Sequence, residues 1–413
     1  MRKDWTKADI SELLEVSIGG VWGSDPGIDE IDVFVYRQTE FDDNGTLSMP
    51  SDAMRSITKN QLKSRTLQPG DVLMQKSAGT PTLPGRVVIV PNAIESNATC
   101  SNFLHLLRAD TNKCTPQFLF WSLWLNHQSG RAFEFQRGTN IKNLDLNQYL
   151  AQTILLPSLA EQKRIVDVVS SVDAYIDALQ QQADTAREAR DALLHDLLEA
   201  VANSPIRKLK DLTSKIGSGA TPRGGEAVYQ NSGVTLVRSQ NVHDAKFVHE
   251  GLVAINDAAA SALDGVSVEA NDVLINITGA SVARTCLVDE TVLPARVNQH
   301  VAILRTDSKV LLPGFLLRVL LGQKMNSYLL DISGSGTTRQ AITKAQLESL
   351  EMAVPPISEQ KRIVEIVSSM DEVIQSTEQA VVDAKALRSG LLSDLLSGNH
   401  EIPASYDSFV GAA

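Results

Sequence analysis

The sequence has few of the residues that build disulfide frameworks, metal sites or membrane spans. Only three of its 413 residues are cysteine (Cys100, Cys114 and Cys286), and they form no C-x-x-C pair, so neither a set of disulfides nor a zinc site is expected. No apolar run approaches the roughly 20 residues of a membrane helix, and the residues after Met1 lack the apolar core of a signal peptide. With 43% hydrophobic and 21% charged residues, we expect a soluble cytoplasmic protein of two or more domains.

Motifs for catalysis are also missing. The chain has no Gly-x-x-x-x-Gly-Lys-Ser/Thr loop, and Gly217-x-Gly219 lacks the third glycine of a dinucleotide fingerprint. The seven histidines form no His-Glu-x-x-His pattern, and neither a Gly-x-Ser-x-Gly motif nor the Asn/Asp-Pro-Pro-aromatic run of amino-methyltransferases occurs. These absences predict a binding protein with no catalytic site, metal or cofactor of its own.

What the sequence does contain is an internal repeat. Pro157–Leu198 recurs as Pro355–Leu396, at a constant offset of 198 residues. The sequence Glu-Gln-Lys-Arg-Ile-Val occurs near the start of both copies, at Glu161 and at Glu359. Each copy follows a variable segment with strand-like patterns, so we expect two related globular heads, each followed by one helix.

Both copies of the repeat have the pattern of a coiled coil. Seam residues recur at alternating spacings of four and three over 32 residue steps, about 48 Å of helix. They are Ile165, Val169, Val172, Ile176, Leu179, Ala183, Ala186, Arg190, Leu193 and Leu197, and then Ile363, Val367, Met370, Ile374, Thr377, Val381, Ala384, Arg388, Leu391 and Leu395. Because a narrow exposed apolar stripe invites aggregation, we expect the two helices to pair with each other, antiparallel.

One seam position in each copy is an arginine. With the symmetry of the repeat, Arg190 faces Met370 and can reach Asp371, and Arg388 and Asp173 are placed in the same way. A charged seam residue costs stability but fixes the register, so we interpret the arginines as the key to the pairing. The alternative is two surface helices on separate domains.

The two heads repeat each other loosely. Asp71 corresponds to Asp272 and Arg108 to Arg305, at offsets between 197 and 201. Both heads contain β-branched runs that predict strands (87–90 and 273–277) and apolar runs that predict short helices (117–125 and 314–321). The sequence therefore predicts an α+β fold in which two pseudo-repeated mixed α/β heads are joined by an antiparallel coiled coil. The expected divisions are 1–156 (first head), 157–203 (first helix), 204–353 (second head), 354–398 (second helix) and 399–413 (C-terminal tail).

The net charge of −11 argues against nucleic acid until its distribution is considered. Basic and acidic residues number 15 and 17 in residues 1–156 and 15 and 14 in 205–353, but 4 and 9 in each of 157–204 and 354–413. The excess acid lies on the helices, so basic clusters on the near-neutral heads can face phosphates. Their electrostatic affinity would be modest, and we expect a partner protein to supply the rest.

The Pro-x-x-x-Glu-Gln-Lys-Arg-Ile-Val sequence, found twice after variable α/β segments, resembles the DNA specificity (S) subunit of Type I restriction–modification systems. The resemblance extends from about residue 10 to Leu396. It implies that each head is a target recognition domain reading half of a bipartite double-stranded DNA target. It also implies that the helices set the spacer and dock two methyltransferase subunits. These partners would supply S-adenosylmethionine and adenine methylation, motor–nuclease subunits would join for cleavage, and this chain would be non-catalytic.

Candidate DNA contacts lie in polar loops of the heads. Threonine, arginine and backbone N–H groups suit phosphates, and arginine, glutamine and asparagine suit base edges. The candidates are Arg37, Lys76, Thr80, Arg86, Arg137, Thr139 and Lys142 in the first head, and Thr221, Arg223, Arg238, Gln240, Asn241, Arg284, Thr337 and Arg339 in the second. On the competing interpretation each is a solvated surface residue or a salt-bridge partner.

Two other functions remain open at this stage. One is a coiled-coil adaptor whose two ligand-binding heads bind protein or peptide instead of DNA. The other is an enzyme whose site no known motif reveals, which S-adenosylmethionine binding by the isolated chain would favour. Neither explains why the helices are nearly identical while the heads diverge, whereas two half-site readers on one spacer do.

Overall fold

The computed structural model describes residues 5–42, 44–48, 52–334 and 340–410. The chain divides into two compact units: unit 1 is Met1–Leu179 with Ala380–Ala413, and unit 2 is Gln180–Gln379. Each unit therefore contains one head together with part of both long helices. We call the part of unit 1 that precedes the first long helix head 1, and the part of unit 2 between the two long helices head 2.

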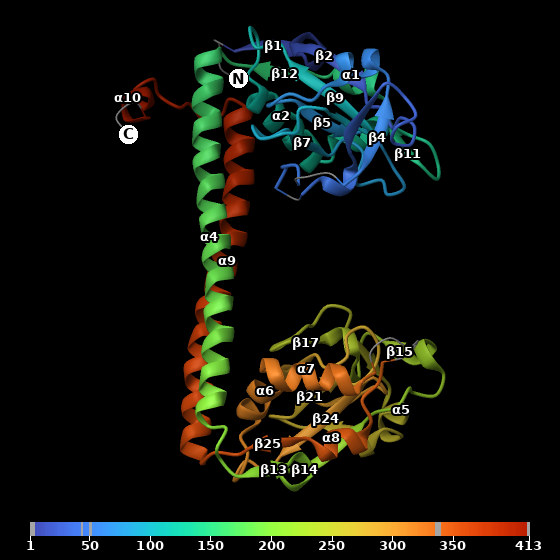
Figure 1. Cartoon of the computed structure of the whole chain (residues 1–413), viewed down its shortest axis with the longest axis vertical. Helices are drawn as coiled ribbons and strands as arrows, with labels where there is room; N and C mark the ends of the chain where they lie inside the picture. Colours follow the sequence, from blue (N-terminus) through green and yellow to red (C-terminus); the bar gives the residue numbers. More distant parts are fainter. Residues whose placement is uncertain (1–4, 43, 49–51, 335–339, 411–413) are drawn as a thin grey trace. The chain divides into compact units, whose positions relative to one another are not determined.

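The two long helices are α4 (Leu159–Ala200, 42 residues) and α9 (Ile357–Leu396, 40 residues). Every seam residue predicted on them is buried or half-buried. Within each unit the helices lie side by side and run antiparallel (Figure 1). The coiled-coil prediction is confirmed, and the alternative of two unrelated surface helices is wrong because it would leave both stripes in solvent.

The seam arginines make the contacts predicted from the repeat. In unit 1, Nη1 of Arg388 lies 2.6 Å from Oδ1 of Asp173, and in unit 2 Nη1 of Arg190 lies 2.9 Å from Oδ1 of Asp371. A slip of the helices by one heptad would separate both pairs and leave charges in the seam. The two ion pairs therefore favour this register.

A buried glutamine ties the start of each long helix to its head. Gln162 and Gln360, the second residues of the repeated Glu-Gln-Lys-Arg-Ile-Val sequence, are fully buried. Oε1 of Gln162 accepts a hydrogen bond from the backbone N–H of Thr115 at 2.8 Å. Its Nε2 donates to the carbonyl oxygens of Lys113 and Pro157, both at 3.0 Å. Gln360 makes the same three kinds of bond to backbone groups of unit 2.

Head 1 contains a four-stranded sheet in the order β2-β9-β5-β7 and a three-stranded sheet in the order β4-β3-β8. The order β10-β11-β6 forms a third sheet, and β1 pairs with β12. The bounds are β1 Thr6–Asp9, β2 Leu14–Gly19, β3 Ile31–Tyr36, β4 Met54–Ile57, α1 Lys59–Arg65, β5 Val72–Gln75, β6 Ser77–Ala78, β7 Val87–Ile89, β8 Ala98–Cys100, β9 Leu104–Ala109, α2 Pro116–Gln128, β10 Gln136–Arg137, β11 Lys142–Leu144, α3 Leu146–Leu150 and β12 Thr153–Leu156.

Head 2 repeats this topology. Its four-stranded sheet has the matching order β14-β24-β21-β22, the parallel pair β16-β23 matches β3-β8, and β13-β25 matches β1-β12. The bounds are β13 Ile206–Lys208, β14 Thr213–Ser218, β15 Tyr229–Gln230, β16 Val234–Val237, β17 Val242–His243, β18 Lys246–Phe247, β19 Val253–Ile255, α5 Asp257–Ser261, β20 Ser267–Val268, β21 Val273–Asn276, β22 Thr285–Leu287, β23 Ala295–Val297, β24 Val301–Thr306, α6 Pro313–Leu321, α7 Gln323–Ile332, α8 Lys344–Ser349 and β25 Glu351–Ala353. The prediction of one fold used twice is confirmed.

The long helices also complete the core of each head. In unit 1, Ile165 and Val169 of α4 and Leu392 and Leu395 of α9 belong to the same buried cluster as the residues of α2. The repeat-related residues do the same in unit 2 with α6: Ile363, Val367, Leu194 and Leu197. Each of these side chains is nearly or fully buried, which is worth about 1.5–3 kcal/mol for a large aliphatic residue.

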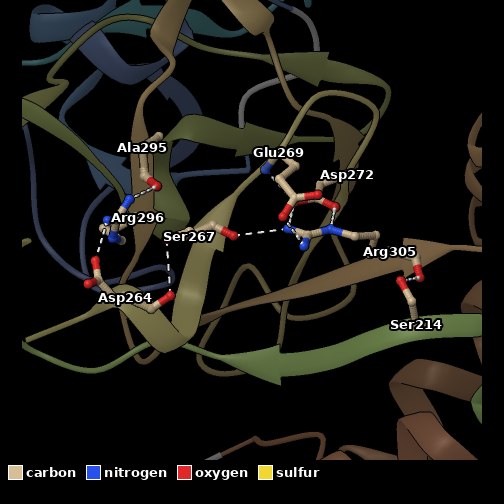
Figure 2. Close-up of polar contacts among 8 residues, drawn as sticks. All are labelled: Ser214, Asp264, Ser267, Glu269, Asp272, Ala295, Arg296 and Arg305. Carbon is tan, nitrogen blue, oxygen red and sulfur yellow. Dashed lines mark hydrogen bonds and ion pairs between the residues drawn. The ribbon is translucent and has the colours of Figure 1, made fainter. Parts of the chain in front are cut away.

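A buried ion pair braces the four-stranded sheet of each head. In head 2, Arg305 on β24 holds both carboxylate oxygens of Asp272 at 2.8 Å and donates to the carbonyl of Ser267 at 3.0 Å (Figure 2). Arg108 and Asp71 form the same bidentate pair at 2.7 Å in head 1. These arginines belong to the scaffold, because their guanidinium groups are already committed to buried carboxylates.

Residues from both terminal segments contact the first turns of α4. Nε1 of Trp5 donates to the carboxylate of the buried Glu161 at 3.0 Å. Arg164 forms a bidentate ion pair at 2.7 Å with Asp407 of α10 (Tyr406–Val410). This ion pair therefore holds the described part of the predicted tail (399–410) against α4.

The three cysteines are buried free thiols. Burial raises the pKa of each thiol to about 12, so none of them ionises near neutral pH. Across the described ranges, no three His, Cys, Asp or Glu side chains are grouped so that they could hold a metal ion. Among the helices of those same ranges, none is long and apolar enough to cross a membrane.

Candidate nucleic-acid interface

In both heads a glycine lies where the first strand of the four-stranded sheet passes a neighbouring turn. A Cβ added to Gly219 would lie 1.6 Å from the carbonyl oxygen of Val297, and one added to Gly20 would lie 2.2 Å from that of Ser101. The N–H of Gly219 donates to the carbonyl of Asn298 at 3.1 Å. Only glycine fits at these crossings. In head 2 this crossing places the loop after β14 beside the turn between β23 and β24.

Head 2 has an open polar cleft of about 500 Å³ next to this crossing. It is formed by the loop after β16, the turn between β21 and β22, and the turn before β24. Its polar side chains include Ser239, Gln240, Thr278, Ser281, Arg284 and His300, and none of the described residues that line it is acidic. The cleft therefore offers donors and a cation to an electronegative ligand.

Of the residues predicted in head 2, Gln240 and Arg284 line this cleft. Arg238 lies on the same loop, where Nη2 donates to the carbonyl of Gly251 at 2.5 Å and the guanidinium stacks 5.4 Å from the ring centre of Tyr229. Thr221 and Arg223 are exposed on the loop after β14. Thr337 and Arg339 lie outside the described residues.

Asn241 does not fit its predicted role. Its side chain is fully buried, and Nδ2 donates to the carbonyls of Val248 and Glu250 at 2.9 and 3.1 Å. Its Oδ1 accepts a hydrogen bond from the backbone N–H of Arg238 at 3.0 Å. Because these bonds occupy the amide inside the head, Asn241 holds the loop that carries Gln240 and presents nothing to a base.

Two arginines predicted in head 1 are occupied by protein groups. Nη2 of Arg86 donates to the carbonyls of Phe41 and Asp42 at 3.0 and 2.8 Å. Arg37 pairs with Glu40 and with Asp52, each at 2.5 Å. The hydrogen bond to Glu40, followed by the charges of both acids, raises the pKa of Arg37. In this structure both arginines stabilise loops of head 1.

The other predicted residues of head 1 lie nearer the solvent. Nη2 of Arg137 donates to Oε1 of Gln148 at 3.0 Å, and Nζ of Lys142 donates to the carbonyl of Gly138 at 2.7 Å. Thr80 and Thr139 are exposed. They stand on the loops around β10 and β11 and before β7.

Lys76 differs from the arginines of head 1. It follows β5 and is half-buried, and among the described residues its ammonium has no ion-pair partner. Burial, with the charge of Lys76 as a second cause, lowers the pKa of His105 to about 4. Within the described part of head 1, the ammonium of Lys76 therefore lies close to the surface without a carboxylate partner.

Most of the cleft was not predicted from the sequence. Ser239, Thr278, Ser281 and His300 line it from three separate loops. Nδ1 of His300 lies 2.5 Å from Oγ1 of Thr278, a contact that no spacing pattern announces. Hydroxyl residues in loops are common, so only the sheet order could bring these ones to one place.

Comparison with known proteins gives matches to one family. The model described as the Type I restriction modification DNA specificity domain matches twice, over residues 2–186 and 204–383. The putative type I restriction enzyme MjaX specificity subunit of Methanocaldococcus jannaschii is 22% identical over 420 residues, covering 96% of this chain and 93% of that protein. The type I restriction enzyme StySPI specificity subunit of Salmonella potsdam is 21% identical over 368 residues, covering 83% and 76%.

Solved structures show the same fold. A chain from a type I R-M system, studied for its complex assembly and conformational transition, matches with a TM-score of 0.58 and 20% identity over 96% of this chain and 98% of that chain. The type I restriction–modification S subunit from M. genitalium matches with a TM-score of 0.51 and 15% identity over 97% of each chain. At these identities the likeness concerns the fold.

Proposed function

The chain belongs to the Type I restriction–modification DNA specificity family, and from this premise we propose that it selects the double-stranded DNA sequence on which a Type I complex acts. Head 1 and head 2 are its target recognition domains, each reading one half of a bipartite target. The observation that carries this proposal is a contrast between scaffold and loops. The glutamine ties and the Asp–Arg braces are the same in both units, while the loops beside them differ in length and side chains.

In this proposal the long helices set the spacer between the half-sites. A helix of 40 residues is about 60 Å long, and half-sites one helical turn apart are separated by about 34–36 Å. The pair is thus long enough for a spacer of more than one turn. The repeat gives it two equivalent docking sites for two methyltransferase subunits. The repeat-related Tyr175 and Val373, 57% and 54% exposed, offer an apolar contact to each.

The chain itself supplies recognition and no chemistry in this proposal. The methyltransferase subunits bind S-adenosylmethionine and methylate adenine, and motor–nuclease subunits join in systems that also cleave. Recognition and methylation of the DNA take place in the cytoplasm in this proposal. The adaptor alternative is not favoured, because the DNA specificity model matches both heads.

The test is co-expression with a Type I methyltransferase subunit from the same genome, followed by single-molecule sequencing for N6-methyladenine. We expect one bipartite motif with a fixed gap. Arg238→Ala should relax or abolish recognition in the half-site read by head 2 and leave the other half-site unchanged. An intact, soluble complex that methylates no motif would contradict the proposal and favour an adaptor.

A further inference from the structure

The turn between β21 and β22 of head 2 presents backbone donors to the cleft. The N–H of Val282 donates to the carbonyl of Gly279 at 3.0 Å, which closes a turn with Ala280 and Ser281 at its centre. Both central residues line the cleft. Within the described part of the chain, neither of their N–H groups has a hydrogen-bond acceptor. Consecutive free N–H groups in a turn are a common anion-binding arrangement.

Side chains around this turn add to the same chemistry. Arg284 follows the turn by two residues and is exposed, and among the described residues its guanidinium has no ion-pair or hydrogen-bond partner. Ser239 and Ser281 bring hydroxyl groups to the cleft, and no acidic residue of the described part of the chain lines it. A phosphate needs N–H and O–H donors together with a cation. Each of these is present in the cleft.

Among its described residues, head 1 has a different arrangement at the equivalent place. The loop between β5 and β7 is three residues longer than the loop between β21 and β22, and its turn contains Pro81, which has no N–H. The carbonyls of Pro81 and Thr82 contact Nε2 of Gln136 and of His127 at 2.7 and 2.9 Å. Arg86, the strand-equivalent of Arg284, is turned onto backbone carbonyls.

We propose that the turn Gly279–Val282 with Arg284 is a phosphate cradle of head 2, which holds one backbone phosphate of the DNA and reads no base. The inference rests on the proposed function and assigns the cleft a positioning role. The described residues of head 1 form no such cradle, so the two heads hold the DNA backbone differently. Base reading in head 2 is left to groups outside the cradle.

The test measures DNA binding by the complex with its methyltransferase, using duplexes with and without the methylated motif, between 50 and 200 mM KCl. Arg284→Ala should weaken binding by a similar factor on both duplexes. It should also reduce the slope of log K against log salt by about 1 and leave the methylated motif unchanged. Ala280→Pro removes one N–H of the turn, as Pro81 does in head 1, at a turn position that tolerates proline. It should weaken binding to both duplexes by a smaller factor than Arg284→Ala does, and it should leave the slope unchanged because no charge is lost.

Lys344→Ala is the matched control, since Lys344 is an exposed cation of the same head outside the cleft and is paired with Glu348. It should change neither affinity nor slope. A motif altered at one base by Arg284→Ala would overturn the cradle and make Arg284 a base reader. An unchanged affinity and slope would overturn it as well.

A second measurement separates this inference from the proposed function. The isolated full chain is titrated with inorganic phosphate and followed by phosphorus NMR, with the Arg284→Ala variant alongside. Line broadening that depends on Arg284 supports the cradle even if the wild-type complex methylates no motif, in which case the proposed function fails alone. A complex that methylates a motif, with no Arg284-dependent effect on phosphate or on DNA, leaves the proposed function standing and the cradle refuted.

Discussion

The two units form the same ion pair between their helices but surround it with different residues. In unit 1 the guanidinium of Arg388 is 5.5 and 5.0 Å from the ring centres of Trp121 and Trp124, and the side chain of Arg388 is 5% exposed. In unit 2 a second arginine, Arg318, takes the place of Trp121 and lies 2.6 Å from the same carboxylate as Arg190. Aromatic rings therefore cover the Arg388–Asp173 pair, whereas Asp371 in unit 2 pairs with two arginines.

This difference shows that the repeated helices determine the ion pair, whereas the head determines its surroundings. The repeat determines that an arginine meets an aspartate, because both residues recur at an offset of 198. The head determines how much water reaches the pair, through the helix that packs on it (α2 or α6). A pair shielded from water interacts more strongly than an exposed one, but it leaves a costlier orphan when one partner is removed.

The largest effect is expected from removing the shielded arginine. Arg388→Ala leaves the half-buried Asp173 without its cation and removes the guanidinium from the two tryptophan rings, which should cost about 3–5 kcal/mol of unfolding free energy. Arg190→Ala leaves Asp371 with Arg318 and should cost about 1 kcal/mol. Urea titration, with hydrogen exchange assigned to each unit, measures both. Equal losses would mean that the covering side chains do not matter.

The same variant has a defined dependence on pH. Burial already raises the pKa of Asp173, against the opposing effect of Arg388. Without Arg388 the folded-state pKa should rise further above the unfolded value. A carboxyl group whose folded-state pKa is raised lowers the stability of the folded protein as the pH rises from its unfolded-state pKa through its folded-state pKa. Arg388→Ala should therefore be more destabilised at pH 8 than at pH 5.

The glutamine ties should behave alike in both units. Gln162→Ala and Gln360→Ala each remove three hydrogen bonds and leave buried backbone groups unpaired, so each should cost about 2–4 kcal/mol. Thermal unfolding with unit-resolved hydrogen exchange tests this equality. A loss of unfolding free energy in only one of the two variants would contradict this equality, because it would mean that the other head is held to its helix by other contacts.

A smaller effect is a dependence of stability on pH that is expected in unit 1 alone. Burial and the charge of Lys76 lower the pKa of His105 in head 1 to about 4, and the strand-equivalent residue in head 2 is Ala302. A histidine with a depressed pKa gives up stability as pH falls from its unfolded value of about 6.5 towards the folded value. Unit 1 should lose about 1–2 kcal/mol over this window, after allowance for partial exposure. His105→Gln should remove the loss, and unit 2 should show none of it at this position.

The smallest effect is expected from the exposed ion pair of the tail. Arg164 pairs with Asp407 in unit 1, and the hydrogen bond from Arg164 lowers the pKa of Asp407. The repeat-related Arg362 pairs instead with Glu359 on its own helix. Asp407→Asn should shift the melting temperature slightly at low salt and not at all at high salt, because such pairs are screened. A large shift would mean that the tail contributes through packing as well as charge.

Much of the scaffold follows from the sequence. The offset of 198 residues, the seam spacing and Arg190 with Asp371 predict two helices, their antiparallel pairing and its register, and all of these are confirmed by the structure. The paired Asp71 and Arg108 predict that the heads share a fold. The candidate interface was less predictable. Asn241 and Arg86 have the chemistry of DNA contacts, but neighbouring carbonyls occupy them, and whether a loop residue faces inward depends on the loops around it.

The sequence by itself determined which residues are repeated, and with them the seam and its ion pairs, because a helix places residues by a fixed period that can be counted along the chain. Only the tertiary structure decided which arginine is shielded by tryptophans, which turn keeps its free N–H groups and which loop residues are buried. These properties depend on segments that lie far apart in the chain and meet only through the order of the strands, and no local period records that order.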